Sequence, residues 1–279
     1  MALSEVRALP QGRFQPLAAQ ACAGDPVTAA IVHPCDPNAI AATMEAASIG
    51  LISPFLVGPE AKIRAAAKAA NLDIRNARLV PAPHSHAAAA AAVSLVASGE
   101  AAMLIKGSLH TDELMSAVLA PTAGLRTERR ISHVYVMDIS NYPRLLLVTD
   151  AAINVEPSLE DKADIVHNAI DLAQILGIAK PRVAILAAVE TVNPRMRSTI
   201  DAAALCKMAD RGQITGALLD GPLALDNAVS LSAAKTKGII SPVAGQADIL
   251  VVPDLESGNI LAKQLEYLAD AAEIGRAHV

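Results

Sequence analysis

The sequence predicts an α/β fold of two lobes, each a parallel-rich sheet flanked by helices. Short runs of Val, Ile and Leu alternate with longer helical stretches along nearly the whole chain, which is typical of parallel sheets covered on both faces. Residues that cap helices or form turns separate these runs. The chain has 279 residues, of which 53% are hydrophobic, so it can form two ordinary domains with full cores.

In the first half, Asp36 is a good cap for a helix with Pro37 in its first turn, and Gly50 can end that helix. A second helix begins at Pro59 and closes near residue 71. A third occupies residues 84–98 and stops at Gly99. The expected strands lie at residues 27–32, 53–58, 101–107, 131–139 and 144–150.

The second half repeats the alternation. Ser158 and Asp161 have the spacing of a capping box for a helix that ends at Gly177. The remaining expected helices lie at residues 195–209, at 225–235 and from Ser257 onward, and the expected strands at 182–188, 213–219 and 247–253. We place the boundary between lobes near Asp150, which gives domains 1–149 and 150–272.

Composition excludes several classes of function. The formal net charge is -5, from 23 basic and 28 acidic residues, which argues against a non-specific nucleic-acid binder. Aromatic residues make up 2% of the chain and Trp is absent, so stacking platforms for single-stranded nucleic acid are not expected. Cys22, Cys35 and Cys206 form no CxxC motif, which indicates reduced thiols in a cytoplasmic protein.

Neither a leader segment nor a membrane span is expected. The first sixteen residues contain no apolar core of the kind found in secretory signals. The most apolar stretch, residues 87–105, is mostly alanine and is interrupted by serines, Gly99 and Glu100. Alanine contributes little to transfer into a bilayer, so this stretch is predicted to be a buried helix followed by a strand.

Familiar catalytic and nucleotide motifs are missing from the sequence. It contains no GxGxxG, GxxxxGK[ST], GxSxG or HExxH. His84 and His86 form an HxH pair at the start of an alanine-rich helix, with no neighbouring Cys or carboxylate. A helix cap or a surface pair is therefore favoured over a metal site.

Basic residues suggest a site for a phosphorylated anion. Arg126, Arg129 and Arg130 fall within seven residues just before a strand, and Lys106 ends another strand. Guanidinium groups match the geometry of phosphate oxygens. A solvated turn is equally consistent with this cluster.

Two strand-to-helix turns offer further polar groups. Thr111 has the position of a helix cap, where backbone N–H groups can bind anions, although the two acidic residues that follow it compete. Asp220 and Asp226 flank Gly221 and Pro222, where they could form either a cap and turn or the wall of a site. In parallel sheets, ligands bind beyond the carboxyl ends of the strands, where these loops are expected.

Long segments of the sequence resemble the phosphate acyltransferase family, the phosphate acetyl- and butyryltransferases. They include GLRTERRISHVYVMDISNYPRLLLVTDAAINVEPSLEDKADIVHNAIDLAQILGI, residues 183–230 and residues 241–270. Shorter matching segments are FLVGPEAKI and LIKGSLHTDEL. The resemblance covers about residues 27–270 and is nearer to the butyryltransferase-like branch.

This resemblance implies an isocitrate/isopropylmalate dehydrogenase-like fold, with two lobes around a cleft, in a homodimer. The implied reaction is acyl-CoA + phosphate ⇌ acyl phosphate + CoA, with acyl groups from acetyl to butyryl. CoA, acyl-CoA, phosphate and acyl phosphate are then substrates, and the chemistry requires no metal or other cofactor. A base and preorganised oxyanion donors would assist attack by the CoA thiolate on the acyl-phosphate carbonyl.

The resemblance also implies which residues line the site. Thr111 and the backbone around Gly107 are expected to hold the phosphoryl group, and Arg129 or Arg130 to offset CoA phosphate charge. The full set of implied substrate-binding residues is Lys106, Gly107, Ser108, His110, Thr111, Arg129, Arg130, Asp150, Asn154, Asp220, Gly221, Pro222 and Asp226. The helix DELMSAVL lacks the arginine that the acetyltransferase branch carries there, which weakens a direct transfer of that branch's acyl preference.

At the carboxyl end the sequence departs from the family pattern. The resemblance implies a later Ser-Arg…Asp segment that supplies catalytic residues and completes the first lobe, and nothing in the sequence matches it. Residues 273–279 do not resemble the family and are expected to be an artefactual tail. These observations predict a truncated, inactive chain with an incomplete first lobe, and leave the catalytic residues unassigned.

Two other functions stay open at this point. A decarboxylating dehydrogenase of related fold would need a metal-binding aspartate cluster and a nucleotide-ribose site, and the sequence shows neither arrangement convincingly. A non-catalytic protein that binds CoA or acyl phosphate would show binding without turnover. Acyl chain length and physiological direction are not determined, because acetyl, propionyl and butyryl differ by single methylenes, each worth about 0.8 kcal/mol.

Overall fold

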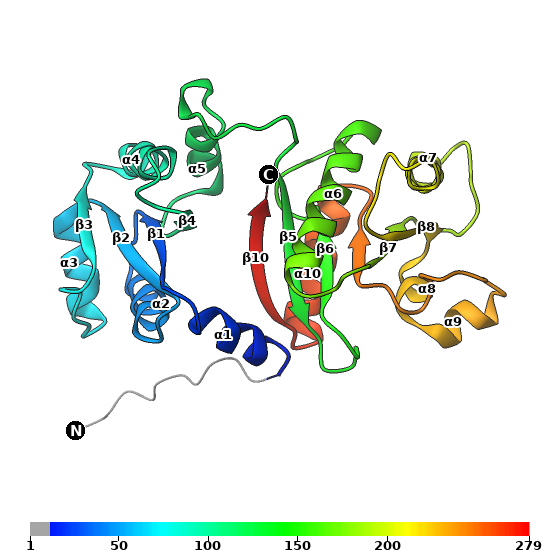
Figure 1. Ribbon diagram of the computed structural model, residues 1–279, viewed down its shortest axis with the longest axis horizontal. Helices are drawn as coiled ribbons and strands as arrows, with labels where there is room; N and C mark the ends of the chain where they lie inside the picture. Colours follow the sequence, from blue (N-terminus) through cyan, green and yellow to red (C-terminus); the bar gives the residue numbers. More distant parts are fainter. Residues whose placement is uncertain (1–11, 279) are drawn as a thin grey trace. The chain divides into compact units, whose positions relative to one another are not determined.

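The structure is a computed structural model that describes residues 12–278. The first eleven residues, for which no leader was expected, lie outside the described residues. The chain divides into two compact units. Pro16–Thr127 form one, here called the N-terminal unit, and Glu128 onward, with the segment up to Gln15, form the C-terminal unit. Figure 1 shows the elements of both units.

The N-terminal unit contains one sheet of four parallel strands in the order β3-β2-β1-β4. Each strand is followed by a helix on the chain. Its strands are β1 (Val27–Val32), β2 (Ile52–Gly58), β3 (Arg78–Pro81) and β4 (Met103–Lys106). Its helices are α1 (Phe14–Cys22), which begins before the unit boundary, α2 (Pro37–Ser48), α3 (Glu60–Ala69), α4 (Ser85–Ala97), α5 (Thr111–Val118) and the short η1 (Pro121–Ala123).

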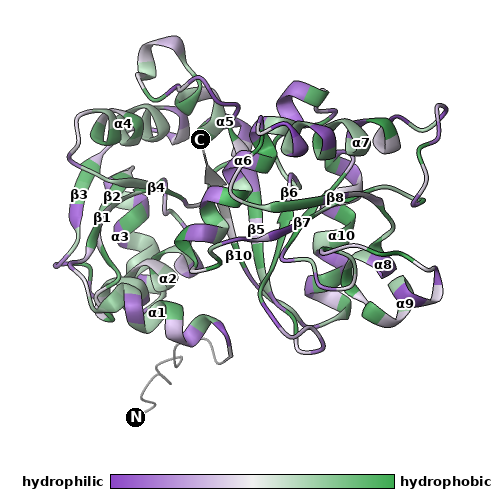
Figure 2. Cartoon of the chain, turned by 45° about the vertical axis from the view of Figure 1, so that its right-hand side comes forward, coloured by the Kyte–Doolittle hydropathy of each residue, from purple (hydrophilic) through white to green (hydrophobic). Residues whose placement is uncertain are grey.

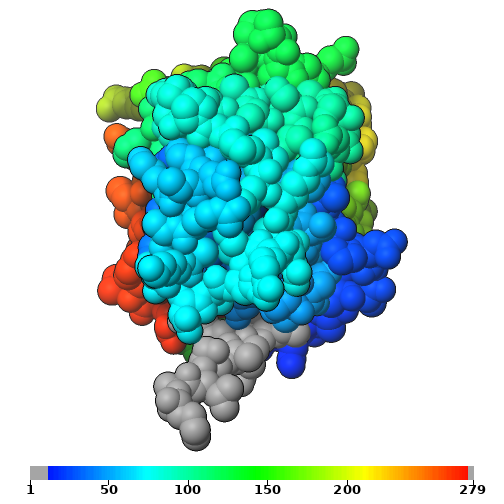
Figure 3. All heavy atoms as spheres, turned by 90° about the vertical axis from the view of Figure 1, so that its left-hand side faces the viewer, coloured from blue at the N-terminus to red at the C-terminus, as the bar shows by residue number. Residues whose placement is uncertain are grey.

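Helices cover both faces of this sheet. On one face, Ile31 and Leu56 pack with Ile40 of α2 and Ile63 of α3. On the other face, small alanines of α4 pack against the strands, together with Leu114 of α5. Alanine side chains let a helix approach a sheet closely, so the alanines of α4 supply much of this core with small side chains. Seen from the β3 side, cyan atoms form most of the unit's surface (Figure 3).

The C-terminal unit contains a mixed sheet of six strands in the order β10-β5-β6-β9-β7-β8. β5 is antiparallel to both of its neighbours, and the other pairs are parallel. The strands are β5 (Ser132–Asp138), β6 (Leu146–Thr149), β7 (Arg182–Leu186), β8 (Leu218–Leu223), β9 (Ile249–Val251) and β10 (Ala272–His278). The helices are α6 (Leu159–Ile175), α7 (Arg197–Asp210), α8 (Leu225–Val229), α9 (Leu231–Thr236) and α10 (Leu255–Leu268).

Both faces of this second sheet are also covered. Helices α6 and α7 contact the strands on one face. On the other, Val148, Leu186 and Leu250 share a core with Ala228 of α8 and Leu261 of α10. Hydrophobic colour runs along β6 and β7, in agreement with their nearly complete burial (Figure 2). Among residues 12–278, no helix combines the length and the hydropathy that crossing a bilayer requires.

The α/β fold class and most elements are confirmed. Asp36 caps α2 by accepting hydrogen bonds from two backbone N–H groups. Ser158 and Asp161 form the expected capping box of α6. His84 caps α4, as the favoured interpretation of the HxH pair proposed. Cap side chains bond only to neighbours a few residues away, which is why the sequence alone identified them.

The division into units differs from the expected boundary near Asp150. β5 pairs with β6 along a hairpin, so the segment from Glu128 belongs to the C-terminal unit. The backbone of residues 272–278, most of which were expected to be an artefactual tail, forms β10 and pairs with the whole of β5. Pairing between distant strands leaves no local signature in a sequence.

Three local predictions are wrong. The strand expected at residues 213–219 is instead β8, which contains Asp220, Gly221 and Pro222 rather than preceding them. β8 is an edge strand with an irregular register, so a proline that lacks an N–H is tolerated there. Thr111 is the first residue of α5 and not its cap, a position taken by His110. The single helix expected at 225–235 is divided at Ser230 into α8 and α9.

The burial of Tyr142 leads us to expect that the C-terminal unit loses stability in alkali. Burial raises the pKa of its phenol to about 12, against the partial opposing effect of Arg144, and its hydroxyl donates to the carbonyl oxygen of Ala247 at 2.5 Å. In the unfolded chain the phenol loses its proton near pH 10. The folded state therefore binds more protons between those values, and stability present below pH 10 is lost as the pH rises towards 12.

Denaturant midpoints at about pH 9 and about pH 11 measure this effect. We expect the wild-type midpoint to fall more across that interval than the midpoint of Tyr142→Phe, which has no phenolic proton. An equal fall in the two proteins would contradict the assignment of the effect to Tyr142.

Candidate functional site

The strand order of the N-terminal unit places its topological switch point between β1 and β4. From β1 the chain passes through α2 to β2 and β3 on one side, and it returns through α4 to β4 on the other side. In open parallel sheets, ligands bind at such a switch point, beyond the carboxyl ends of the two adjacent strands. The loops at this point are residues 33–36, after β1, and residues 107–110, after β4.

Hydrogen bonds hold these two loops together. The N–H of Gly107 donates to the carbonyl oxygen of Val32 at 2.9 Å, and the N–H of Ser108 donates to that of His33 at 3.0 Å. The hydroxyl of Ser108 accepts from the N–H of Cys35 at 3.0 Å and donates to a carboxylate oxygen of Asp36 at 2.5 Å. The loop that contains Ser108 is therefore fixed against the first strand.

Gly107 is required by the closeness of this contact. A Cβ atom at Gly107 would lie 2.6 Å from the carbonyl oxygen of Val32 and 3.0 Å from that of His33. Contacts below 3.0 Å force a shift of the backbone. The residue type is thus explained by packing between the two loops.

Two titratable groups beside Ser108 are shifted in opposite directions. The hydrogen bond from Ser108 lowers the pKa of Asp36, and the N–H of Ala39 adds to this effect. Burial raises the pKa of the Cys35 thiol, although the positive charge of Lys62 opposes that shift. Asp36 is therefore held as a carboxylate, and Cys35 is held as a thiol.

The structure brings together the five site residues expected around GSLHT. Lys106 ends β4, and its Nζ donates to the carbonyl oxygen of Leu109 at 2.9 Å. His110 caps α5 without a side-chain hydrogen bond to the helix, and Thr111 begins that helix. With Gly107 and Ser108, these residues form one polar edge at the carboxyl end of β4.

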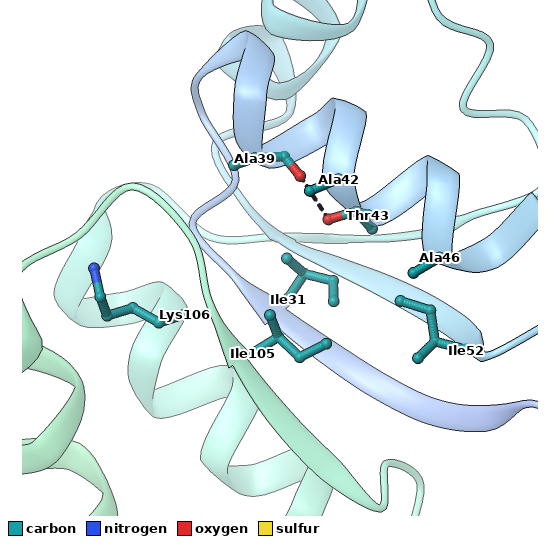
Figure 4. Close-up of a pocket in the computed structure, with 8 residues that line it drawn as sticks. All are labelled: Ile31, Ala39, Ala42, Thr43, Ala46, Ile52, Ile105 and Lys106. Carbon is teal, nitrogen blue, oxygen red and sulfur yellow. Dashed lines mark hydrogen bonds between the residues drawn. The ribbon is translucent and has the colours of Figure 1, made fainter. Parts of the chain in front are cut away.

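An apolar cavity lies beside this edge, under α2. Its volume is about 140 Å³, and its walls come from α2 and from strands β1, β2 and β4 (Figure 4). The lining residues are Ile31, Ala39, Ala42, Thr43, Ala46, Ile52, Ile105 and Lys106. In Figure 4 the amino group of Lys106 points away from the isoleucines, so the cavity itself offers mainly hydrocarbon contacts.

In the C-terminal unit, Asp150 and Asn154 lie together after β6, and Arg130, which precedes β5, bonds to Asn154. One carboxylate oxygen of Asp150 accepts from the N–H groups of Ala152 and Ile153, at 2.9 and 3.1 Å. Its other oxygen accepts from the side-chain amide of Asn154 at 2.6 Å. The amide oxygen of Asn154 in turn accepts from Nε of Arg130 at 2.7 Å. These bonds order the turn that follows the strand.

The two arginines expected to face CoA phosphates also make ion pairs within their own unit. Arg129 pairs with Asp171 of α6 at 2.5 Å, and Arg130 pairs with Asp161 at 3.4 Å. Their side chains are 42% and 54% exposed, so solvent reaches both. A role in offsetting CoA phosphate charge stays a prediction.

The group from Asp220 to Asp226 lies apart from Asp150, because β9 and β7 separate β6 from β8. Asp220 accepts from the N–H of Gly221 within β8. Pro222 follows in the same strand. Asp226, in the first turn of α8, lies 3.9 Å from Lys237, which also pairs with Glu190 at 2.5 Å. The expected site residues of this unit therefore form two groups.

Sequence reasoning missed His33 and Cys35 and treated Asp36 only as a cap. The available signal was their position: VHPCD follows the first strand, where the carboxyl-end rule predicts ligand contact. In the described part of the chain, no three His, Cys, Asp or Glu side chains are grouped so that they could hold a metal ion.

Comparison with known proteins shows extensive similarity to phosphate acyltransferases. The chain is 58% identical to "Phosphate acetyltransferase" of Rhizobium meliloti, over 93% of this chain and 83% of that protein. It is 56% identical to "Phosphate acetyltransferase" of Rickettsia prowazekii, over 90% of this chain and 72% of that protein. It is 42% identical to "Phosphate butyryltransferase" of Clostridium acetobutylicum, over 86% of this chain and 80% of that protein.

Solved structures show the same likeness. A branched-chain phosphotransacylase from Enterococcus faecalis V583 matches with a TM-score of 0.79 and 30% identity, over 90% of this chain and 88% of that chain. A phosphotransacetylase from Streptococcus pyogenes, at 20% identity, shares the fold with a TM-score of 0.77, over 95% of this chain and 89% of that one. A putative 4-hydroxythreonine-4-phosphate dehydrogenase from Salmonella typhimurium, at 14% identity, has a TM-score of 0.51 over 87% and 85% of the two chains. This agrees with a dehydrogenase-like fold.

Residues 82–277 match the family described as "Phosphate acetyl/butaryl transferase". The matched range ends at residue 277, and the artefactual tail expected over residues 273–279 stays a prediction. The expectation of an inactive fragment gains no support from these similarities. They cover most of this chain at high identity. The chain belongs to the phosphate acetyl/butaryl transferase family, which consists of acyltransferases.

Proposed function

We propose that the protein catalyses reversible transfer of a short acyl group between CoA and inorganic phosphate. The 58% identity to a phosphate acetyltransferase, over 93% of the chain, carries this proposal. Acetyl is the proposed acyl group, because relatives named acetyltransferases reach 55–58% identity and the butyryltransferase of Clostridium acetobutylicum reaches 42%. CoA acts as a substrate, no resident cofactor takes part, and the enzyme works as a homodimer in the cytoplasm.

The position of the GSLHT loop at the switch point supports a role in holding the phosphoryl group. Thr111 begins α5, so its hydroxyl and the N–H groups of the first helical turn can donate to phosphate oxygens. The backbone around Gly107 is rigidly placed by its bond to Val32. A rigid donor set adds to catalysis because it needs no reorganisation when charge develops on the transferred group.

Thiol release from acyl-CoA in the presence of phosphate tests the proposal. We expect phosphate-dependent release with acetyl-CoA, propionyl-CoA and butyryl-CoA, and the highest kcat/KM with acetyl-CoA. Burial of one methylene is worth about 0.8 kcal/mol, so a pocket that fits acetyl and excludes a further methylene should lower kcat/KM by roughly fourfold or more for each added methylene. Omission of phosphate is the control, because hydrolysis alone also releases thiol.

Calorimetry with CoA distinguishes the alternatives. CoA binding without phosphate-dependent thiol release would favour the non-catalytic reading and agree with an inactive chain. Turnover by the 279-residue chain would contradict both. The decarboxylating dehydrogenase reading would require reduction of a nicotinamide nucleotide by a hydroxy acid, which we do not expect.

A further inference from the structure

Every polar group of Ser108 bonds to the loop that follows β1. Its N–H donates to the carbonyl oxygen of His33 at 3.0 Å. Its own carbonyl oxygen lies 3.0 Å from Nδ1 of His33, and this nitrogen carries the proton because a carbonyl oxygen only accepts. Its hydroxyl accepts from the N–H of Cys35 at 3.0 Å and donates to the carboxylate of Asp36 at 2.5 Å. One short loop, 72 to 75 residues earlier in the chain, therefore holds Ser108.

The loop after β1 is itself held in place. The φ of His33 is +55°, in the left-handed region that residues other than glycine rarely adopt, and its N–H donates to the carbonyl oxygen of Val57 at 2.7 Å. The second carboxylate oxygen of Asp36 accepts from two backbone N–H groups in the first turn of α2, each at 2.9 Å. The bonds from Ser108 therefore end on groups that are fixed to the sheet and to α2.

These bonds also determine where α5 begins. Thr111, the first residue of α5, lies three residues after Ser108. Leu109, between them, is 7% exposed and shares a core with Leu114 of α5. The chain is thus fixed at Ser108 by hydrogen bonds and at Leu109 by burial, immediately before the helix starts. The direction of the first N–H groups of α5 follows from both.

We propose that Asp36 is a positioning residue for acyl transfer, an inference that rests on the proposed function. By accepting the one side-chain proton of Ser108, Asp36 orients the GSLHT loop so that Thr111 and the first turn of α5 meet the phosphoryl group. Ser108 then has no proton left for a phosphate oxygen, and it acts through the geometry of the loop. A displacement of about 1 Å in such an arrangement lowers the rate by about 100-fold.

The charge of Asp36 agrees with this role. The hydrogen bond from Ser108 and that from the N–H of Ala39 lower the pKa of Asp36, so the group is a carboxylate at neutral pH. A carboxylate only accepts hydrogen bonds, which fixes Ser108 as the donor. Direct contact between this carboxylate and an anionic phosphoryl group would be repulsive. Action through Ser108 is therefore favoured over contact with the substrate.

Asp36→Asn removes the acceptor and keeps the helix cap. Asparagine caps helices as well as aspartate does, and its amide oxygen can still accept from the N–H groups of α2. The amide nitrogen that then faces Ser108 is a donor and cannot take its proton. We expect a melting temperature within about 4 °C of wild type. We expect kcat/KM for acetyl phosphate to fall by about 10- to 100-fold, and KM for CoA to stay within about twofold.

A double-mutant cycle with Ser108→Ala tests whether Asp36 acts through Ser108. Two residues that act through one shared bond give losses that do not add. Ser108→Ala and the double variant Asp36→Asn/Ser108→Ala should therefore each lose about as much activity as Asp36→Asn alone. Multiplied losses in the double variant would overturn action through Ser108. A much larger loss in Ser108→Ala than in Asp36→Asn would do the same, because it would indicate a direct bond from Ser108 to the substrate.

Asp73→Asn is the matched control. Asp73 lies in the same unit, between α3 and β3 and so near the amino ends of the strands, and its partner is the exposed Arg75. The same exchange of carboxylate for amide should leave the kinetics there unchanged.

Asp36→Ser supplies a second variant. Serine also caps a helix, but its shorter side chain does not reach Ser108, so the same loss of kcat/KM is expected. A folded Asp36→Asn or Asp36→Ser protein with kcat/KM within about threefold of wild type would overturn the role of Asp36 and leave the proposed function intact. An inactive wild-type chain would overturn both.

Discussion

Replacement of Gly107 with alanine is expected to lower acyl transfer by at least about 100-fold, because a displacement of about 1 Å in a catalytic arrangement has effects of that size. The new Cβ would lie 2.6 Å from the carbonyl oxygen of Val32, far inside ordinary contact of 3.4–4 Å. Backbone on both sides of the contact must move, and with it the bonds that join Ser108 to His33 and Asp36. Overpacking of this kind also costs about 1–3 kcal/mol of stability.

Gly24→Ala is the matched control for this variant. Gly24 lies in the same unit, has no positive φ, and a Cβ there would approach nothing closer than 3.8 Å. It should therefore keep wild-type activity and stability, or gain a few tenths of a kcal/mol. Thiol-release kinetics and denaturant unfolding measure both properties. Full activity in Gly107→Ala would show that the closeness of the two loops has no catalytic consequence.

Replacement of Lys162 with methionine is expected to destabilise the C-terminal unit by about 3–5 kcal/mol. Lys162 of α6 pairs with Asp201 of α7 at 2.8 Å, and the two side chains are only 6% and 8% exposed. Without the ammonium group, the buried carboxylate would keep only the more distant Arg197, at 3.6 Å. An uncompensated buried charge is what makes the loss so large.

The double variant Lys162→Met/Asp201→Leu tests that explanation. Two apolar side chains fill the same space without a buried charge, so the double variant should regain most of the lost stability. Lys207→Met is the control for an exposed pair, since the Lys207 and Asp210 side chains are 66% and 64% exposed. Its effect should stay below about 1 kcal/mol. Additive losses in the double variant would show that side-chain packing, and not charge, connects α6 and α7.

From the sequence alone, candidate site residues could be identified only where they form part of a recognisable local motif. GSLHT was found through its resemblance to the family, and it does lie at the end of β4. His33 carried no such local sign, because its tautomer depends on Ser108, 75 residues away. The arginine cluster was visible as three charges, but the carboxylate of Asp171, which pairs with Arg129, lies 42 residues further along the chain.

The same holds for the fold: features that depend on neighbouring residues were predicted, and features that depend on distant residues were not. Asp36, Ser158 and Asp161 cap helices as expected, since their partners are at most three residues away. The position of β8 was missed, because its residues pair with β7 and not with neighbours in sequence. β10 was excluded from the fold on sequence grounds, yet its backbone completes one edge of the second sheet.

The sequence by itself determined the α/β class, the helix caps and the family of this protein. Hydrophobic periodicity, capping and extended similarity are all properties of residues near one another along the chain. Only the tertiary structure decided the order of strands, the boundary at residue 128 and the conjunction of His33 with Ser108. These features depend on contacts between segments that are far apart along the chain, and such contacts leave no recognisable pattern in the local sequence.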